Sequence, residues 1–456
     1  RGHWTADRGR VACDHSRRRT RSTPTAAGST MRPPYRRLSL LATALLVATA
    51  LPSSTAARWP DAGDRASAVV TLFAAGVTTA AIAAAEGCTV RRVQQIVAEA
   101  GMQPPALPLH PHFEAVVQYE MLRHGPNYGF NMLLGALLSH WPSWRWPRER
   151  VVAEMRRVDP VAYEARRQWA TRRIQRGVYF APHFFYSLHI DLACKIQEYH
   201  VYCAAAQDGC TRAIIGLTAL SDKMPITVYE QFFEPIARVH GLPDQVVTDK
   251  GNEWRLLAFA CFLAARLAQR LGGRLPHRFT SSQHNIVERF NFEINMRVLA
   301  PVRCLINAME RRRLLSKEEP RQVYAFSLVV QPLVQYGLNL LHRSWNAHRI
   351  SARKGCPGTG GVPNKRVCTH PHPGAQAQLP AGVDMAALYE AANQEPLRRV
   401  PEYTAAAEPL LAHPQLRAQR AAAVAAIVGP DIGAAWMEII ACNYARFIHA
   451  YLTFLG

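Results

Sequence analysis

The chain has 456 residues, 49% of them hydrophobic and 19% charged, which allows two to four domains with buried cores and excludes a wholly disordered protein. It carries 54 Lys and Arg against 33 Asp and Glu, a formal net charge of +21. Such a surplus attracts polyanions, so nucleic acid is the first partner that we expect. An anionic membrane surface and a basic secreted protein are the alternatives.

Residues 1–66 are predicted to be a disordered or targeting-like extension. Within them, residues 31–57 place basic residues before a short apolar run and small residues after it, as in a secretory or organelle-targeting segment. The apolar run is short for a transmembrane helix. The chain begins with Arg1 rather than Met, so we discount this targeting signal and expect no membrane association.

Residues 67–102 show the helical spacing of a small helix-turn-helix unit. We predict helices at 79–86 and 89–100, with Gly87 in the turn between them and Thr89 as an N-cap. The unit resembles the helix-turn-helix of transposases and repressors. Its second helix would present Arg91, Arg92, Gln94 and Gln95 to phosphates and base edges. The alternative is a plain three-helix bundle with a solvated basic face.

A second helical unit is predicted at 103–165, with a final helix that starts at Pro147. One interpretation is another helix-turn-helix, whose core would contain Trp141, Trp144 and Trp146; simple structural packing explains these tryptophans equally well. A basic connector follows at 166–182.

From residue 183 the pattern changes to that of an α/β domain. Runs of β-branched and aromatic residues predict strands at 187–191, 199–206, 212–220, 245–248 and 277–280. Helices are predicted at 225–240, at 253–269 and from about residue 282 onward. This order is compatible with a mixed five-stranded sheet flanked by helices, of the RNase H-like type.

Three carboxylates in this α/β domain stand out by position. Asp191 interrupts an apolar strand, Asp249 ends another, and Glu288 lies on the helix that follows the fifth strand. An ionised carboxylate in or beside a buried strand is costly unless it is paired or binds a metal. All-oxygen ligation suits Mg²⁺ or Mn²⁺, and two such ions about 4 Å apart could clamp the oxygens of a phosphoryl displacement.

The sequence around these acids resembles the catalytic core of retroviral integrases and DDE transposases, particularly integrase-core proteins of eukaryotic mobile elements. The matching stretches are His189–Asp191, Tyr199–Tyr202, Asp208–Arg212, Gly241–Gly251, His284–Arg289, Trp345–Arg349 and Gly361–Asn364. The 38 residues between Asp249 and Glu288 are close to the spacing typical of such cores. The resemblance implies that Asp191 bridges two metal ions, that Asp249 holds one and that Glu288 holds the other.

For other residues near the three acids the sequence indicates a role less specifically. Lys195, Lys250 and Arg289 are plausible phosphate contacts. Glu293 is a possible competitor of Glu288, and Asp208 is expected to be a turn residue rather than a ligand. The zinc module that precedes retroviral integrase cores is missing, because the ten cysteines form no C-x-x-C pair.

The predicted core spans 183–366 and is followed by a linker at 367–383 and a helical tail at 384–456. The resemblance implies metal-dependent DNA end cleavage and strand transfer, with DNA as partner, homo-oligomers on DNA ends and a nuclear location. The alternative is a catalytically silent DNA-binding protein domesticated from a mobile element.

Overall fold

The computed structural model describes residues 62–74, 79–86, 88–102, 107–170, 181–269, 273–280, 285–351, 360–399 and 413–456. Most of the predicted extension at 1–66 and of the basic connector at 166–182 lies outside these ranges. So do Gly87, predicted as a turn residue, and His284, part of one matching stretch.

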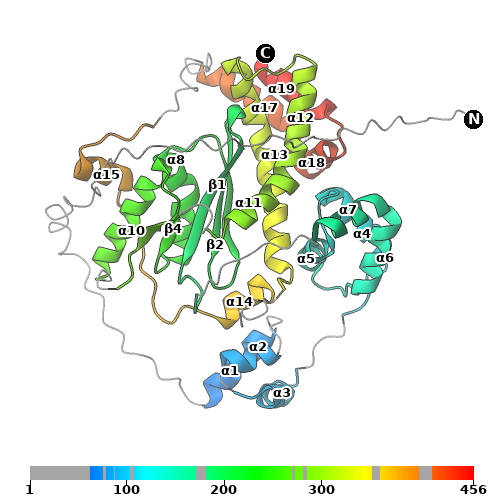
Figure 1. Ribbon diagram of the computed structural model, residues 1–456, viewed down its shortest axis with the longest axis vertical. Coiled ribbons are helices and arrows are strands. Elements are labelled where there is room, and N and C mark those ends of the chain that lie inside the picture. The colour runs from blue at the N-terminus through cyan, green and yellow to red at the C-terminus, as the bar shows by residue number, and fades with distance from the viewer. Residues whose placement is uncertain are drawn as a thin grey trace, which may run out of the picture. The chain divides into compact units, whose positions relative to one another are not determined.

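One mixed sheet of five strands forms the centre of the α/β domain (Figure 1). The strands are β1 (Leu188–Ile196), β2 (Val201–Asp208), β3 (Ile214–Leu220), β4 (Val246–Thr248) and β5 (His277–Phe279), and their order across the sheet is β3-β2-β1-β4-β5. β1, β2 and β3 pair antiparallel, whereas β1, β4 and β5 pair parallel. The predicted RNase H-like sheet is confirmed.

The first strand is longer than its sequence pattern indicates. We expected it to end at Asp191, but β1 continues through Leu192 and Ala193 to Ile196. The continuation pairs with β2, from Leu192 opposite Ala204 to Ile196 opposite Val201. Asp191 therefore lies inside a central strand, where its neighbours fix the direction of its side chain.

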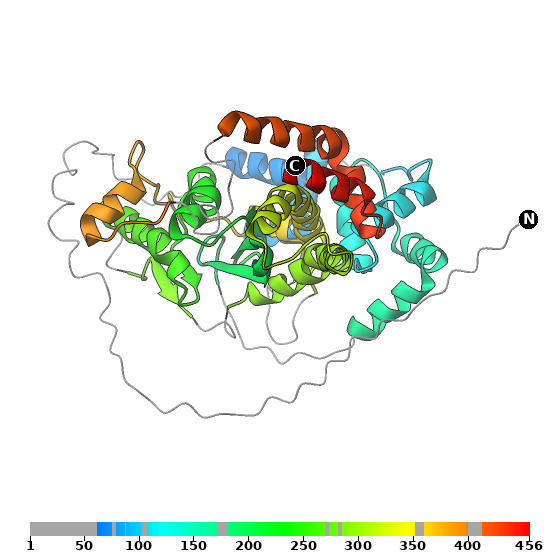
Figure 2. The same ribbon diagram turned by 90° about the horizontal axis from the view of Figure 1, so that it is seen from above.

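Helices cover both faces of the sheet. They are α8 (Pro225–Val228), α9 (Glu234–His240), α10 (Arg255–Leu267), α11 (Glu288–Ile294), α12 (Ala300–Arg311) and α13 (Pro320–Ala347). α10 contacts β5, α11 contacts β1 and α13 contacts β3. Figures 1 and 2 show the sheet with helices packed around it. α8 and α9 are joined by a π-helical turn at Tyr229–Phe233, just before Pro235, whose missing N–H cannot continue the regular ladder.

The long helix α13 protects the open edge of the sheet. β3 is an edge strand, and its free backbone groups would be a template for pairing with another chain. Asn346 occupies them: its Oδ1 accepts from Ile214 N and its Nδ2 donates to Ile214 O, both at 2.8 Å. Gln335 accepts from Ala219 N at 2.8 Å. The Trp345–Arg349 stretch of the resemblance thus contains an edge-strand clamp.

The predicted second helical unit consists of α4 (Phe113–His124), α5 (Phe130–His140), α6 (Arg148–Val158) and α7 (Pro160–Ala170). Its apolar cluster includes Phe113, Leu133 and Trp146, with Trp141 and Trp144 packed against it. The tryptophans therefore serve packing. α1 (Ala62–Ala74), α2 (Thr79–Ala85) and α3 (Val90–Glu99) form a smaller cluster of their own.

The C-terminal part of the chain is helical, as expected, with α14 (Pro363–Thr369), α15 (Met385–Asn393), α17 (Pro414–Val428), α18 (Ile432–Ile440) and α19 (Ala445–Leu455). In the described part of the chain, one run, Pro414–Ile440, is long and apolar enough by length and composition to cross a membrane. A tight turn at Gly429–Asp431 divides this run, and Trp436 in its second half is buried in the core cluster.

Candidate active site

The parallel pairing of β1 and β4 sets Asp191 and Asp249 side by side. Leu188 pairs with Val246 and His189 with Val247, an offset of 58 residues, and the same offset relates Asp191 to Asp249. Neighbours at one level of a parallel pair point to the same face of the sheet. The two carboxylates therefore project together at the carboxyl end of β4.

Asp191 is half-buried, and two donors hold its side chain in place. Oδ1 accepts from Leu192 N at 2.9 Å, and Oδ2 accepts from Asn291 Nδ2 at 2.8 Å. Burial is the main cause that raises the pKa of Asp191 to about 7, and the negative charges of Glu288 and Asp249 add to it. The two donors lower the pKa but do not offset these effects, so this site disfavours its own negative charge.

Asp249 is positioned by the turn that follows β4. Its Oδ1 accepts from Trp254 Nε1 at 2.6 Å and from Gly251 N at 3.2 Å. Trp254 is buried, with 1% of its surface exposed. The indole therefore anchors the carboxylate to the interior, and a rigid aromatic group fixes the direction of the second acid.

Glu288 is the first residue of α11 and is exposed. Two asparagines attach its helix to β1. Asn285 donates to Ile190 O at 3.1 Å and lies 3.0 Å from His189 Nδ1, and Asn291 donates to Asp191. Residues three apart share one helix face, so Glu288 lies beside the Asn291 contact with Asp191.

Glu288 is electrostatically coupled to the other acids and to a lysine. Partial removal of its carboxyl group from water raises its pKa; the charge of Lys195 opposes that change and the charge of Asp249 adds to it. Together with the effects on Asp191, these couplings bring the three acids into one electrostatic cluster.

The three carboxylates are near one another without meeting at a single point. Among the described residues, two other groups have three ligand atoms that all lie within 4.8 Å of one another: Glu120 with His124 and His140, and His183 with Asp244 and His372. The three acids do not form such a group. One ion could not take one oxygen from each of them in this arrangement.

Glu293, the possible competitor of Glu288, is engaged elsewhere. Its two oxygens lie 2.5 Å from Arg289 Nη1 and 2.5 Å from Arg297 Nη2. Two guanidinium groups neutralise this carboxylate, so it has a structural partner set and no need of a metal. Asp208 is likewise satisfied: its Oδ1 accepts from Phe185 N and its Oδ2 from Thr211 N.

The expected phosphate contacts have different surroundings. Lys195, at the edge of the acid cluster, and Lys250, next to Asp249, are both exposed. Arg289 is exposed as well but forms an ion pair with Glu293, and its guanidinium lies 5.0 Å from the centre of the Phe292 ring. The two lysines are therefore the freer cations of the three.

In α3 the four candidate residues Arg91, Arg92, Gln94 and Gln95 are all exposed, while Val93, Ile96 and Val97 are buried. Thr89 caps the helix, since its side chain accepts from Arg92 N at 3.2 Å. Two of the four interact with Glu99: Gln95 Nε2 donates to its carboxylate at 2.8 Å, and Arg92 forms an ion pair with it at 3.8 Å.

Sequence reasoning missed Asn291 and Trp254, which hold the first two acids. A signal for Asn291 existed, since it follows Glu288 by three residues on a helix and must share its face. No comparable signal marks Trp254, because a tryptophan five residues after Asp249 is equally typical of a buried anchor without any polar role.

The comparison with protein families agrees with this geometry. Residues 178–358 match the model of an integrase core domain. This part of the chain is therefore an integrase catalytic core of the retroviral integrase and DDE transposase superfamily, a family of polynucleotidyl transferases. No curated protein matches the chain.

Proposed function

We propose that residues 183–366 cleave DNA ends and join the freed 3′ hydroxyl to a target strand, with Asp191, Asp249 and Glu288 holding Mg²⁺ or Mn²⁺. The observation that carries the proposal is the approach of three carboxylates from β1, β4 and α11, which raises the pKa of Asp191 to about 7 through burial and through the other two charges. Such a cluster gains most from a bound cation.

The residues at this cluster fit a hard divalent ion. All three acidic side chains offer oxygen, the donor that Mg²⁺ and Mn²⁺ prefer. Asn291 adds a further oxygen: its Oδ1 is buried without a hydrogen-bond partner, while its Nδ2 donates to Asp191. An unsatisfied buried oxygen beside the acids is what a cation or its water shell would use.

A single ion held by one oxygen from each acid does not fit the spacing. The oxygens of the three acids do not all lie within 4.8 Å of one another. By the resemblance to integrase cores, Asp191 would help to hold both ions, Asp249 one of them and Glu288 the other. When bound, a metal pair would supply charge stabilisation for an in-line displacement at a phosphate.

The protein's own part in the reaction is to hold and orient. Trp254 and Gly251 fix the Asp249 carboxylate, and Asn291 fixes that of Asp191. Lys195 and Lys250 add positive charge at the margin of the acid cluster, where DNA phosphates would approach. Positioning and electrostatics of this kind, without a covalent nucleophile, suffice for phosphoryl transfer.

The first test is strand transfer by the Asp191→Asn variant. With the full chain, labelled DNA ends and Mg²⁺, we expect transfer to fall at least about 1,000-fold, because the shared ligand is lost. Binding to the same DNA should persist. The matched control is Glu253→Gln, which removes a nearby half-exposed carboxylate outside the cluster and should leave transfer unchanged.

Two results would overturn the assignment: transfer retained by Asp191→Asn, or equal losses in both variants. If the wild-type chain binds DNA but neither cleaves nor joins it with Mg²⁺ or Mn²⁺, the chain is instead a catalytically silent DNA-binding protein.

For the N-terminal helices we propose a second role, with α3 as the recognition helix of a helix-turn-helix. The support is a helix whose outer face carries Arg91, Arg92, Gln94 and Gln95 and whose inner face is apolar. The overall charge of +21 favours DNA as the ligand of this face. DNA as substrate also suggests a nuclear location, and the need to hold two DNA ends suggests a homo-oligomer.

Salt dependence tests this role. Replacing Arg91 and Arg92 together by Ala should weaken DNA binding and reduce the slope of log affinity against log salt by about two, one for each lost phosphate contact. The control is the double change Arg312→Ala and Arg313→Ala, an adjacent exposed pair after α12. An unchanged slope in the α3 variant, or an equal change in the control, would remove α3 from the DNA interface.

A further inference from the structure

A second cluster of metal-ligating side chains lies at the opposite end of β4. It joins His183, before β1, to Asp244, before β4, and to His372, after α14. Asp244 precedes Asp249 by five residues, so β4 separates the two acids by about 16 Å. The cluster is therefore distinct from the acid cluster at the carboxyl end of the strand.

The three side chains converge on the Asp244 carboxylate. His372 Nε2 lies 3.0 Å from its Oδ1, and His183 Nε2 lies 3.6 Å from its Oδ2. The chosen ligand atoms all lie within 4.8 Å of one another. Ligands of a tetrahedral ion with bonds of 2.0–2.1 Å are about 3.3 Å apart, and the two measured separations fall on either side of that value.

The outer nitrogen of each histidine faces a backbone oxygen. His183 Nδ1 lies 3.0 Å from Phe184 O, and His372 Nδ1 lies 2.6 Å from Gly374 O. Gly374 N also donates to His372 Nδ1 at 3.2 Å, so the contacts of this ring fit either tautomer; the tautomer with its proton on Nδ1 donates to Gly374 O. Donation from Nδ1 leaves Nε2 of the neutral ring as the lone-pair atom, and this arrangement is the usual one for metal-ligating histidines.

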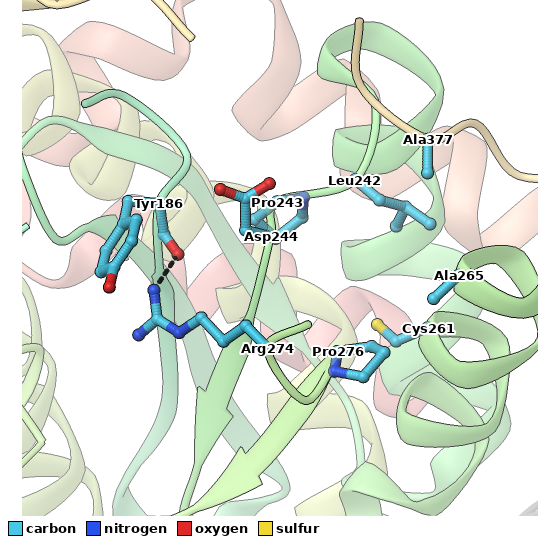
Figure 3. Close-up of a pocket in the computed structure, with 9 residues that line it drawn as sticks. All are labelled: Tyr186, Leu242, Pro243, Asp244, Cys261, Ala265, Arg274, Pro276 and Ala377. Atoms are coloured by element: carbon cyan, nitrogen blue, oxygen red, sulfur yellow. Dashed lines mark hydrogen bonds between the residues drawn. The ribbon is translucent and has the colours of Figure 1, made fainter. Parts of the chain in front are cut away.

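The surroundings leave one side of the cluster open. The side chains of His183, Asp244 and His372 are 17%, 27% and 8% exposed. Asp244 also borders a cleft of about 390 Å³, where Arg274 donates to Tyr186 O at 2.8 Å (Figure 3). Solvent can therefore reach the fourth position of a tetrahedral site.

We propose that His183, Asp244 and His372 bind one zinc ion, with water as fourth ligand. Two imidazole nitrogens and one carboxylate favour zinc over Mg²⁺, which prefers oxygen alone. The ligands come from three segments far apart in the sequence, so the ion ties the segment after α14 to the core. Leu242 pairs with Ala377 beside the same cluster, which makes the ion an addition to an existing contact.

The competing explanation is a simple ion pair between a protonated His372 and Asp244. It accounts for the 3.0 Å contact and also, as a longer ion pair, for His183, whose Nε2 lies 3.6 Å from the carboxylate. The two explanations predict different behaviour toward metal, and measurement separates them.

The test uses the full chain after removal of metal with a chelator. Zinc binding is measured by equilibrium dialysis, and Co²⁺ replaces zinc as a visible probe, because tetrahedral Co²⁺ with nitrogen ligands absorbs far more strongly than octahedral Co²⁺ with oxygen ligands. We expect one zinc equivalent in the wild-type chain that survives Asp191→Asn, and a strong Co²⁺ band.

In the double variant His183→Gln and His372→Gln, that equivalent should be lost or weakened at least about 100-fold, beyond the effect typical of an outer partner. His449→Gln, an exposed histidine in α19, should keep it. No zinc equivalent in the wild-type chain, a weak octahedral Co²⁺ band, or an equivalent that disappears only with Asp191→Asn would overturn the proposal. The wild-type spectrum decides the matter even if the double variant fails to fold.

Discussion

Glu120 in α4 and Asp191 in β1 are both carboxylates removed from water, yet their surroundings shift the pKa in opposite directions. Burial alone would raise the pKa of Glu120, but hydrogen bonds from His124 and His140 outweigh it and hold the pKa well below its usual range. Trp141 Nε1 donates to Oε1 of the same carboxylate at 3.0 Å. At Asp191, burial and two neighbouring acids raise the pKa to about 7.

The difference lies in what faces each carboxylate. Glu120 is fully buried. Trp141 Nε1 and His140 Nδ1 contact its oxygens within 3.1 Å, His124 Nε2 lies 3.1 Å away and Arg123 3.7 Å away. Asp191 is met by other acids and by only two donors. A buried charge that faces several donors and cations is stabilised, whereas a group of acids with few donors is unfavourable until a cation binds. The first arrangement compensates the charge with the chain's own groups, whereas the second leaves it to be compensated by a cation.

The largest effect that follows from this comparison is on the stability of the helical unit. Glu120→Ala removes the acceptor shared by His140 and Trp141 and leaves their donors buried. We expect the free energy of unfolding to fall by about 3 kcal/mol. Unfolding can be followed by tryptophan fluorescence, to which Trp141, Trp144 and Trp146 of this unit contribute.

The conservative change Glu120→Gln separates charge from hydrogen bonding. It keeps an acceptor for Trp141 but loses the negative charge, so its loss of stability should be about half that of Glu120→Ala. Glu114→Gln is the control for charge alone, since Glu114 is exposed and pairs with Arg150 at 2.7 Å. If the Glu120→Ala variant were as stable as the wild type, the donors around Glu120 would not stabilise the fold, and the contrast with Asp191 would fail.

Sequence patterns identified the sheet and the acid cluster because both rest on local signals. β-branched runs between turns mark the strands, and Asp191 and Asp249 are conspicuous as charges inside apolar runs. The end of β1 was placed too early because a charged residue resembles a strand terminus. Only the pairing with β2 shows that the strand continues.

The remaining features depend on contacts between distant segments. Asn346 could be recognised as part of a motif. Its hydrogen bonds to Ile214 could not be deduced, because they depend on the position of α13 beside the edge strand β3. The cluster of His183, Asp244 and His372 draws on three separate loops. Glu120 and His124 are four apart on one helix, which sequence can show, but His140 joins them only through packing of α4 and α5.

A smaller effect is expected at the acid cluster, with the opposite sign. In the absence of divalent metal, Asp191→Asn removes a charge that the fold disfavours. The pKa of Asp191 is about 7 in the folded chain against an ordinary value of 3.8. The folded state therefore binds more protons than the unfolded state between these values, and stability falls as pH rises from about 4 to 7.

A shift of this size corresponds to about 4 kcal/mol as an upper bound. Because Asn keeps only part of the hydrogen bonding, we expect Asp191→Asn to be more stable than the wild type by about 1–3 kcal/mol at pH 8. At pH 4, where Asp191 is protonated in the folded chain, the difference should vanish. Thermal unfolding at the two pH values, in the presence of a chelator, measures it at about 2–4 °C per kcal/mol.

Adding Mg²⁺ at pH 8 should reduce the difference in stability between Asp191→Asn and the wild type, since bound metal raises the stability of the wild type and not of the variant. The same pH 8 comparison with Glu253→Gln should show no gain. If Asp191→Asn were instead less stable than the wild type at pH 8 without metal, the carboxylate would already be satisfied by its donors. The acid cluster would then be of the same kind as the cluster around Glu120.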